Sequence, residues 1–208
     1  MKKFLSLKSP EGVSEVVRDH WIEVNFILPQ PITIVTTVDK SGRVNVALKS
    51  WVMYCSTRDI MFGCNVKHDT AKNVLETGEF VVNIPSIDIL KQTGVPAVPY
   101  LKGVSEIEEA GLTAMPSSKV RPPRIKECKA HVECKLLWHK RLGDNAIIFI
   151  GRIVALSLDE DIFDKEKMHM KTLDLHQMLL VPEGIGVIER TELLEKIIQK
   201  FRSFLSKP

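Results

Sequence analysis

The 208-residue sequence lacks the features of a membrane or secreted protein. Its mean hydropathy is near zero, and it has no apolar run long enough for a membrane-spanning helix. Two lysines follow Met1, but Lys8, Pro10 and Glu11 interrupt any apolar core of a signal peptide. We therefore expect a cytoplasmic protein.

The chain also lacks metal-binding and serine-hydrolase motifs. No cysteines have the Cys-x-x-Cys spacing and no histidines the His-x-x-x-His spacing that zinc sites use. No Gly-x-Ser-x-Gly elbow is present either. We expect no metal site and four reduced, mostly buried thiols. For Cys64 two interpretations are open, a small core filler or a contact to a ligand.

Basic and aromatic residues are too scattered to favour nucleic-acid binding. The net charge is +3, and aromatic residues make up 6% of the chain. Residues 119–129 are the densest basic stretch, but Pro122 and Pro123 favour an extended connector without stacking side chains. We interpret this stretch as a solvated loop, with contact of Arg121 or Arg124 to an anionic ligand as the alternative. An oligonucleotide-binding barrel is the least favoured function.

Short apolar runs alternate with turn signals near the N-terminal end. Ile32–Val38 is followed by turn residues Asp39–Gly42 and a second run, Val44–Val52, which is typical of a hairpin. In the second strand, alternate side chains point to opposite faces. One face is apolar, and the other is formed by Asn45, Ala47 and Lys49. The second face can receive a flat polar ligand.

The next segment predicts a phosphate site. The apolar run Met61–Val66 leads into a helical pattern that begins near Asp69 or Thr70 and ends at Gly78. The free N–H groups and the dipole of a helix start attract anions, and two nearby lysines add positive charge. The alternative is a helix capped by Asp69, with solvated lysines.

The rest of the chain continues the β pattern. Three strands and a terminal amphipathic helix are predicted at Phe80–Ile84, Lys129–Trp138, Ala146–Leu158 and Glu192–Leu205. For Gly151 three interpretations are open, a bulge, a close approach of another backbone or a bare sheet crossing. Consecutive strands come too close together for helical crossovers, so about six strands predict a closed or split β-barrel with peripheral helices. We expect one domain over residues 1–208, with its core at about 30–161.

Four segments in order resemble the flavin reductase-like proteins of the FMN-binding split-barrel group, which includes the flavoredoxins. They are PITIVTT from Pro31, DKSGRVNVALKSW from Asp39, KHDTAKNVLETGEFVVN from Lys67 and GDNAIIFIGRI from Gly143. The resemblance implies a mainly β, Greek-key split barrel that binds FMN. It also implies a homodimer whose flavin sites lie near the interface.

By this similarity, ten residues would contact or approach FMN. Those along the isoalloxazine ring or the ribityl chain would be Thr36, Thr37, Asn45, Val46, Ala47 and Ser50, with Trp51 nearby. Those at the phosphate would be Lys67, Thr70 and Asn73. No side chain is required as a general base, because the flavin supplies the chemistry.

The resemblance implies an FMN-dependent oxidoreductase of the flavin reductase or flavoredoxin type. Its donor would be NADH, NADPH or another redox protein. Two positions differ from the family: Ser56–Asp59 stands in place of a common Pro-Pro loop, and Asn145 in place of a common histidine. The alternative is therefore an FMN-binding electron carrier, or a flavin-binding module without direct NAD(P)H turnover.

Overall fold

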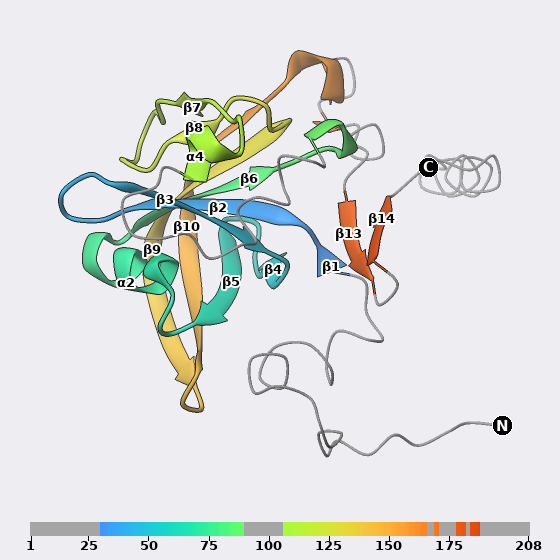
Figure 1. Cartoon of the computed structure of the whole chain (residues 1–208). Coiled ribbons are helices and arrows are strands. Elements are labelled where there is room, and N and C mark those ends of the chain that lie inside the picture. The colour runs from blue at the N-terminus through green and yellow to red at the C-terminus, as the bar shows by residue number, and fades with distance from the viewer. Residues whose placement is uncertain (1–29, 90–105, 166–168, 171–177, 182–183, 188–208) are drawn as a thin grey trace, which may run out of the picture.

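The computed structural model describes residues 30–89, 106–165, 169–170, 178–181 and 184–187, and its centre is a curled antiparallel sheet of seven strands. The order across this sheet is β3-β2-β6-β9-β10-β5-β4 (Figure 1). The strands are β2 (Thr33–Val38), β3 (Val44–Lys49), β4 (Val52–Tyr54), β5 (Asp59–Asn65), β6 (Glu79–Ile84), β9 (Ala130–Leu142) and β10 (Ala146–Leu158). The predicted mainly β split barrel is confirmed, with seven strands in place of about six.

Short elements surround this sheet. The helices are α2 (Asp69–Thr77), η1 (Ile87–Ile89), α4 (Glu106–Glu109) and η3 (Glu160–Ile162). The minor strands are β1 (Gln30–Pro31), β7 (Ala114–Met115), β8 (Arg124–Ile125), β11 (Phe163–Asp164), β12 (His169–Met170), β13 (Met178–Val181) and β14 (Gly184–Val187). Within the described ranges, no helix is long and apolar enough to cross a membrane. The predicted helix at Glu192–Leu205 lies outside the described residues.

The predicted continuous strand over Val44–Val52 is wrong, because the chain breaks at Ser50 and Trp51. β3 ends at Lys49, and β4 begins at Val52, whose N–H donates to the carbonyl of Ser50 at 3.0 Å. β3 and β4 are the two edge strands of the curled sheet. The break is therefore where the chain passes from one edge of the half-barrel to the other.

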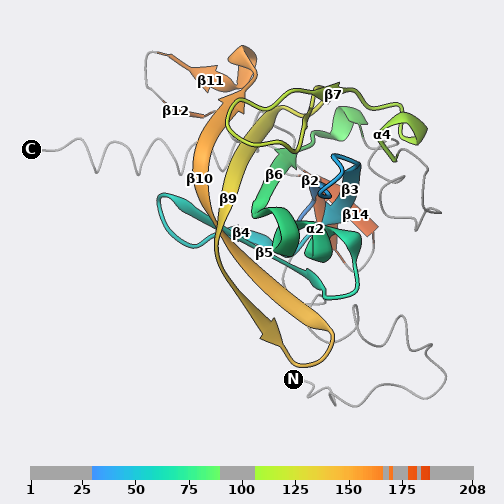
Figure 2. The same cartoon turned by 90° about the vertical axis from the view of Figure 1, so that its left-hand side faces the viewer.

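The curl brings the two edges together. Residues of β3 and β5 approach within 8 Å between Cα atoms, although these strands are not hydrogen-bonded neighbours. Helix α2 contacts β2, β3, β5 and β6, so it crosses the inner side of the sheet next to this opening (Figure 2). We call the opening between β3 and the β4–β5 hairpin the split.

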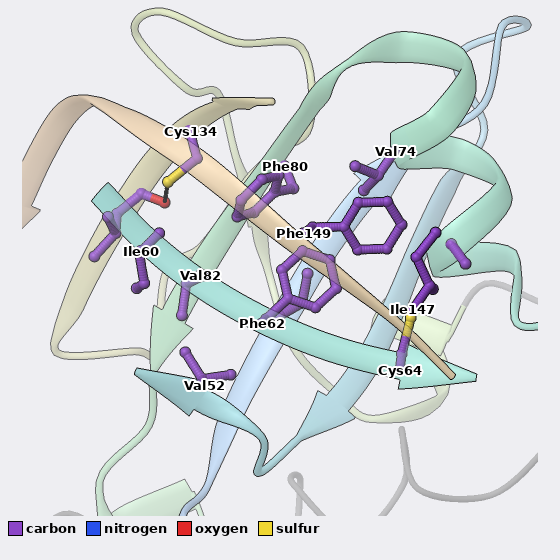
Figure 3. Packing of buried hydrophobic residues seen from close by; sticks show 13 residues of the cluster. Val52, Ile60, Phe62, Cys64, Val74, Phe80, Val82, Cys134, Ile147 and Phe149 are labelled. Atoms are coloured by element: carbon purple, nitrogen blue, oxygen red, sulfur yellow. Dashed lines mark hydrogen bonds between the residues drawn. The ribbon is translucent and has the colours of Figure 1, made fainter. Parts of the chain in front are cut away.

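The main core fills the inside of the curl. Phe62 lies between Phe80 and Phe149, with ring centroids 4.9 Å and 5.1 Å away, and Val74 of α2 packs onto the same cluster (Figure 3). The β10–β9 register shifts between Ile150 and Gly151, as the bulge interpretation of Gly151 predicted, and a Cβ on residue 151 would lie 2.7 Å from Cε1 of the Phe80 side chain. The inside of the half-barrel is thus a packed core.

A second core covers the outer face of β2 and β3. Ile34 and Val46 pack there against α4 and the segment that follows it, including Leu112 and Ile125. The long β9–β10 hairpin extends past the rest of the sheet (Figure 1). Because every residue of β2 is buried whereas Asn45 and Ala47 of β3 are only partly buried, a ligand can reach this part of the sheet only at β3, beside the split.

The basic stretch at 119–129 is not a solvated loop throughout. The N–H groups of Ser118 and Lys119 donate to the carboxylate of Glu133, which is 1% exposed, at distances from 2.7 to 3.0 Å. Arg121 pairs with Glu79, and Arg124 donates to the carbonyl of Pro116. Buried carboxylates need such donors, and here they hold the loop on the barrel.

Candidate functional site

Four polar side chains meet where helix α2 rests on the edge of the sheet. The hydroxyl of Thr37 accepts hydrogen bonds from Nδ2 of Asn45 at 3.3 Å and from Nδ2 of Asn73 at 3.0 Å. Nδ2 of Asn45 also donates to the hydroxyl of Thr70 at 3.1 Å. These bonds connect β2, β3 and α2, so four of the predicted cofactor residues lie together. We call them the polar cluster.

The start of α2 is arranged as an anion site would be. The N-cap is His68, which makes no side-chain capping bond, and its carbonyl accepts the N–H groups of Ala71 and Lys72. The backbone N–H groups of Asp69 and Thr70, the first two residues of the helix, have no acceptor within the helix. Asp69 does not cap the helix. Its carboxylate instead pairs with Nζ of Lys72 at 2.7 Å on the surface, which offsets its repulsion of an anion.

Lys67 is exposed in the turn before α2. Its N–H donates to Oδ1 of Asn65 at 2.9 Å, which fixes the turn. The N–H of the adjacent Val66 donates to the carbonyl of Asn145 at 2.9 Å. The turn of the β9–β10 hairpin therefore lies next to the helix start, a proximity that the sequence did not indicate.

The predicted residues of β2 and β3 divide between two faces. Asn45 and Ala47 share the inner face with Thr37, as the strand register requires. Thr36 and Val46 face the second core: the Thr36 hydroxyl donates to the carbonyl of Pro123 at 2.6 Å, and Val46 is 1% exposed. Neither side chain therefore reaches the inner face, and Thr36 also lies on β2, which pairs with β3 on one side and β6 on the other.

Ser50 and Trp51 form the turn at one end of the split. The indole of Trp51 is 39% exposed and lies over Gly63, whose N–H donates to the Trp51 carbonyl at 2.9 Å. Cys64 follows on β5 and is 8% exposed, and burial raises the pKa of its thiol to about 11. Cys64 belongs to the main core, which agrees with the filler interpretation.

Lys49 was missing from the set of cofactor residues predicted from the sequence. It is 9% exposed, and it follows Asn45 and Ala47 on the same face of β3. Burial raises the pKa of the Cys64 thiol on β5, and the positive charge of Lys49 opposes part of this rise. The period-2 pattern of the strand had placed it on the face that can receive a flat ligand, but the family resemblance did not include it among the ten residues.

The donor set fits FMN. A phosphate needs N–H donors and positive charge, which the α2 start and Lys67 provide. β3 is an edge strand of the seven-stranded sheet, and its partly buried Asn45 and Ala47 offer a small, polar surface to a flat heteroaromatic ring. Among the described residues, no group of three or more His, Cys, Asp or Glu side chains is placed to hold a metal ion.

Residues 26–177 match the family model described as the flavin reductase like domain, which is well over half of the chain. The chain belongs to this family. Membership makes it a flavin-related protein of the oxidoreductase class, and it agrees with the split barrel described above. The family resemblance inferred from the four sequence segments is therefore confirmed.

Individual relatives agree with the family assignment. The chain is 32% identical over 160 residues to an uncharacterised protein, YwrF, of Bacillus subtilis, covering 72% of this chain and 78% of that one. The crystal structure of nitrilotriacetate monooxygenase component B from Bacillus cereus has a TM-score of 0.77 and 25% identity, covering 92% and 98%. The flavoredoxin of Desulfovibrio vulgaris has a TM-score of 0.72 and 19% identity, covering 83% and 93%.

Proposed function

We propose that this flavin reductase-like protein binds FMN in the split and works as an FMN-dependent oxidoreductase. The observation that carries the proposal is the position of the α2 start and Lys67 beside the polar cluster, which joins α2 to the edge strand β3. One end of the site provides donors for a phosphate, and the other provides the partly buried face of Asn45 and Ala47, together with Trp51, for a ring. Bound flavin would supply hydride or electron transfer.

The residues of the chain would bind and orient the cofactor. Lys67 and the first N–H groups of α2 would hold the phosphate, and Thr70 and Asn73 would position that helix end through the polar cluster. Asn45, Ala47 and Ser50 would line the ribityl chain and the ring, together with Val46 on the same edge strand. Contact of Thr36 with the cofactor stays a prediction. The split would exclude water from one side of the ring, because the main core lies behind it.

We propose NADH or NADPH as the direct donor, with an FMN-binding electron carrier as the second candidate. Asn145 favours the second candidate. It lies in the turn of the β9–β10 hairpin, next to the start of α2, at a position where many family members carry a histidine that this chain lacks. Anaerobic addition of NADH or NADPH to the FMN-loaded protein separates the two. Bleaching of the flavin absorbance within seconds supports direct reduction, whereas bleaching by dithionite alone supports the carrier.

We also propose a homodimer, as the family resemblance implies. An apolar row runs across the outer face of four strands, formed by Met53, Met61, Ile150 and Trp138 in register. Met53 and Trp138 are 57% and 49% exposed, and exposed apolar rows of this kind mark association surfaces. A second copy is the proposed occupant.

Light scattering at several concentrations tests the dimer. The wild-type chain is expected to have twice the mass of one subunit, and Met53→Glu with Trp138→Glu is expected to reduce it to a monomer. A monomeric wild-type chain would refute the homodimer. The cytoplasmic location and the single domain over residues 1–208 stay predictions.

A further inference from the structure

Lys49 is a buried cation at the open edge of the half-barrel. It ends β3 and is 9% exposed, which is unusual for a lysine because burial removes hydration from the ammonium group. The Thr33 hydroxyl donates to its carbonyl at 2.9 Å, which fixes the end of the strand. Nζ of Lys49 donates to the carbonyl of Leu48 at 3.3 Å, so the side chain folds back along its own strand.

The position of this charge relates it to the proposed ring site. Lys49 shares the inner face of β3 with Ala47 and Asn45, whose amide is part of the polar cluster. Its charge acts on the thiol of Cys64, on the other side of the split. Lys67, the candidate phosphate ligand, is a separate and exposed cation in the turn that follows β5. The two lysines therefore lie at different places: Lys67 at the α2 start, and Lys49 at the end of β3, four residues beyond Asn45 of the polar cluster.

The two charges have different consequences for a flavin. The phosphate carries the same charge whether the ring is oxidised or reduced, so a lysine near it stabilises both states equally. Reduction by a hydride adds two electrons and one proton to the ring, which leaves one negative charge on the edge with N1 and the C2 carbonyl. A cation near that edge stabilises the reduced state alone, and more strongly where water is excluded.

We propose that Lys49 sets the reduction potential of the bound flavin, by stabilising the negative charge that the ring gains on reduction. This inference rests on the proposed FMN site. It assigns Lys49 a role in tuning the cofactor that is distinct from the anchoring role of Lys67.

The test compares the affinities of the protein for oxidised FMN and for dithionite-reduced FMN, in anaerobic titrations. In Lys49→Met, the affinity for reduced FMN is expected to fall about tenfold more than the affinity for oxidised FMN. This change corresponds to a potential lower by about 30 mV for a two-electron couple. Lys49→Arg keeps the charge and is expected to keep the wild-type ratio.

Lys67→Met is the matched control, because it also removes one lysine charge at the site. It is expected to weaken both states by the same factor. The inference is overturned if Lys49→Met leaves the ratio of the affinities for reduced and oxidised FMN unchanged. It is also overturned if Lys67→Met changes this ratio as much as Lys49→Met does. If Lys49→Met does not fold, Lys49→Gln is compared with Lys49→Arg in the same way. A wild-type chain that binds FMN in neither state overturns the proposed function as well.

Discussion

Gly63 and Trp51 form the contact that holds the β3–β4 turn against β5. The N–H of Gly63 donates to the carbonyl of Trp51 at 2.9 Å, and a Cβ on residue 63 would stand 2.5 Å from Cδ2 of the indole. Real Cβ atoms do not approach other atoms so closely, so the indole can lie there only because residue 63 is glycine. The contact presents an aromatic face beside the split.

Gly63→Ala is expected to displace the Trp51 indole. Because the added methyl group overpacks this contact, we expect a loss of about 1–3 kcal/mol in the free energy of unfolding. Denaturant unfolding measures the loss. Trp51→Ala removes the ring, so the Gly63→Ala change should cost much less in that background. Equal costs in both backgrounds would show that the indole does not lie over Gly63.

Asn73→Ala is expected to loosen α2 from the sheet. Asn73 is 6% exposed, and its amide donates to the Thr37 hydroxyl, so its removal leaves a buried hydroxyl with fewer partners. We expect a cost of about 1–3 kcal/mol in the free energy of unfolding. Glu76→Ala, at an exposed position of the same helix, serves as the control and should change it by less than about 0.5 kcal/mol. Equal effects would contradict a tethering role.

Glu133→Ala is expected to release the loop over residues 116–123. The buried carboxylate accepts bonds from Ser118 and Lys119, which would lose their acceptor. We expect faster tryptic cleavage after Lys119 and a loss of about 3 kcal/mol in the free energy of unfolding. Glu109→Ala, an exposed change on α4, is the control. Unchanged cleavage in Glu133→Ala would show that other contacts hold the loop.

His131 is expected to make the fold sensitive to acid. Its Nε2–H donates to the carbonyl of Ile125 at 2.8 Å, and its Nδ1 lies 3.0 Å from the Ser157 hydroxyl. Burial lowers the pKa of His131 below its ordinary value, so the unfolded chain binds more protons than the folded chain. Stability is therefore full above the ordinary pKa of about 6.5 and is lost as the pH falls below it.

The measurement is the free energy of unfolding between pH 7.5 and pH 5. One proton contributes a slope of up to about 1.4 kcal/mol per pH unit. His131→Gln should be less stable at pH 7.5 but should show a flatter slope. The same slope in both proteins would assign the acid sensitivity to other groups.

Local patterns predicted most of the strands and the main helix. The β-branched run of β2, the Asp39–Gly42 turn and the Gly78 cap of α2 depend on neighbouring residues alone, and all three occur as expected. The break at Ser50 was not predictable, because it depends on where the sheet edges meet. Nearby sequence does not encode that position.

Long-range partners explain the remaining differences. Thr36 is a small polar residue of the kind that can face a ligand from a strand. Its hydroxyl instead donates a hydrogen bond to the carbonyl of Pro123, 87 positions away. The charges at 119–129 suggested a solvated loop. Glu133 of β9, the strand that follows in the sequence, holds this loop through hydrogen bonds to its carboxylate. The strand period placed Lys49 on the face expected to receive a ligand, but its burial at 9% exposure follows from the curl of the sheet, which local sequence does not encode.

Titration of the purified chain with FMN and with riboflavin, followed by flavin fluorescence, tests the central claim most directly. The two ligands share the ring and the ribityl chain and differ in the phosphate. The α2 start and Lys67 predict that FMN binds at least about tenfold more tightly than riboflavin, and that Lys67→Met reduces this preference. Equal affinities for the two ligands, or binding of neither, would contradict an FMN site in the split.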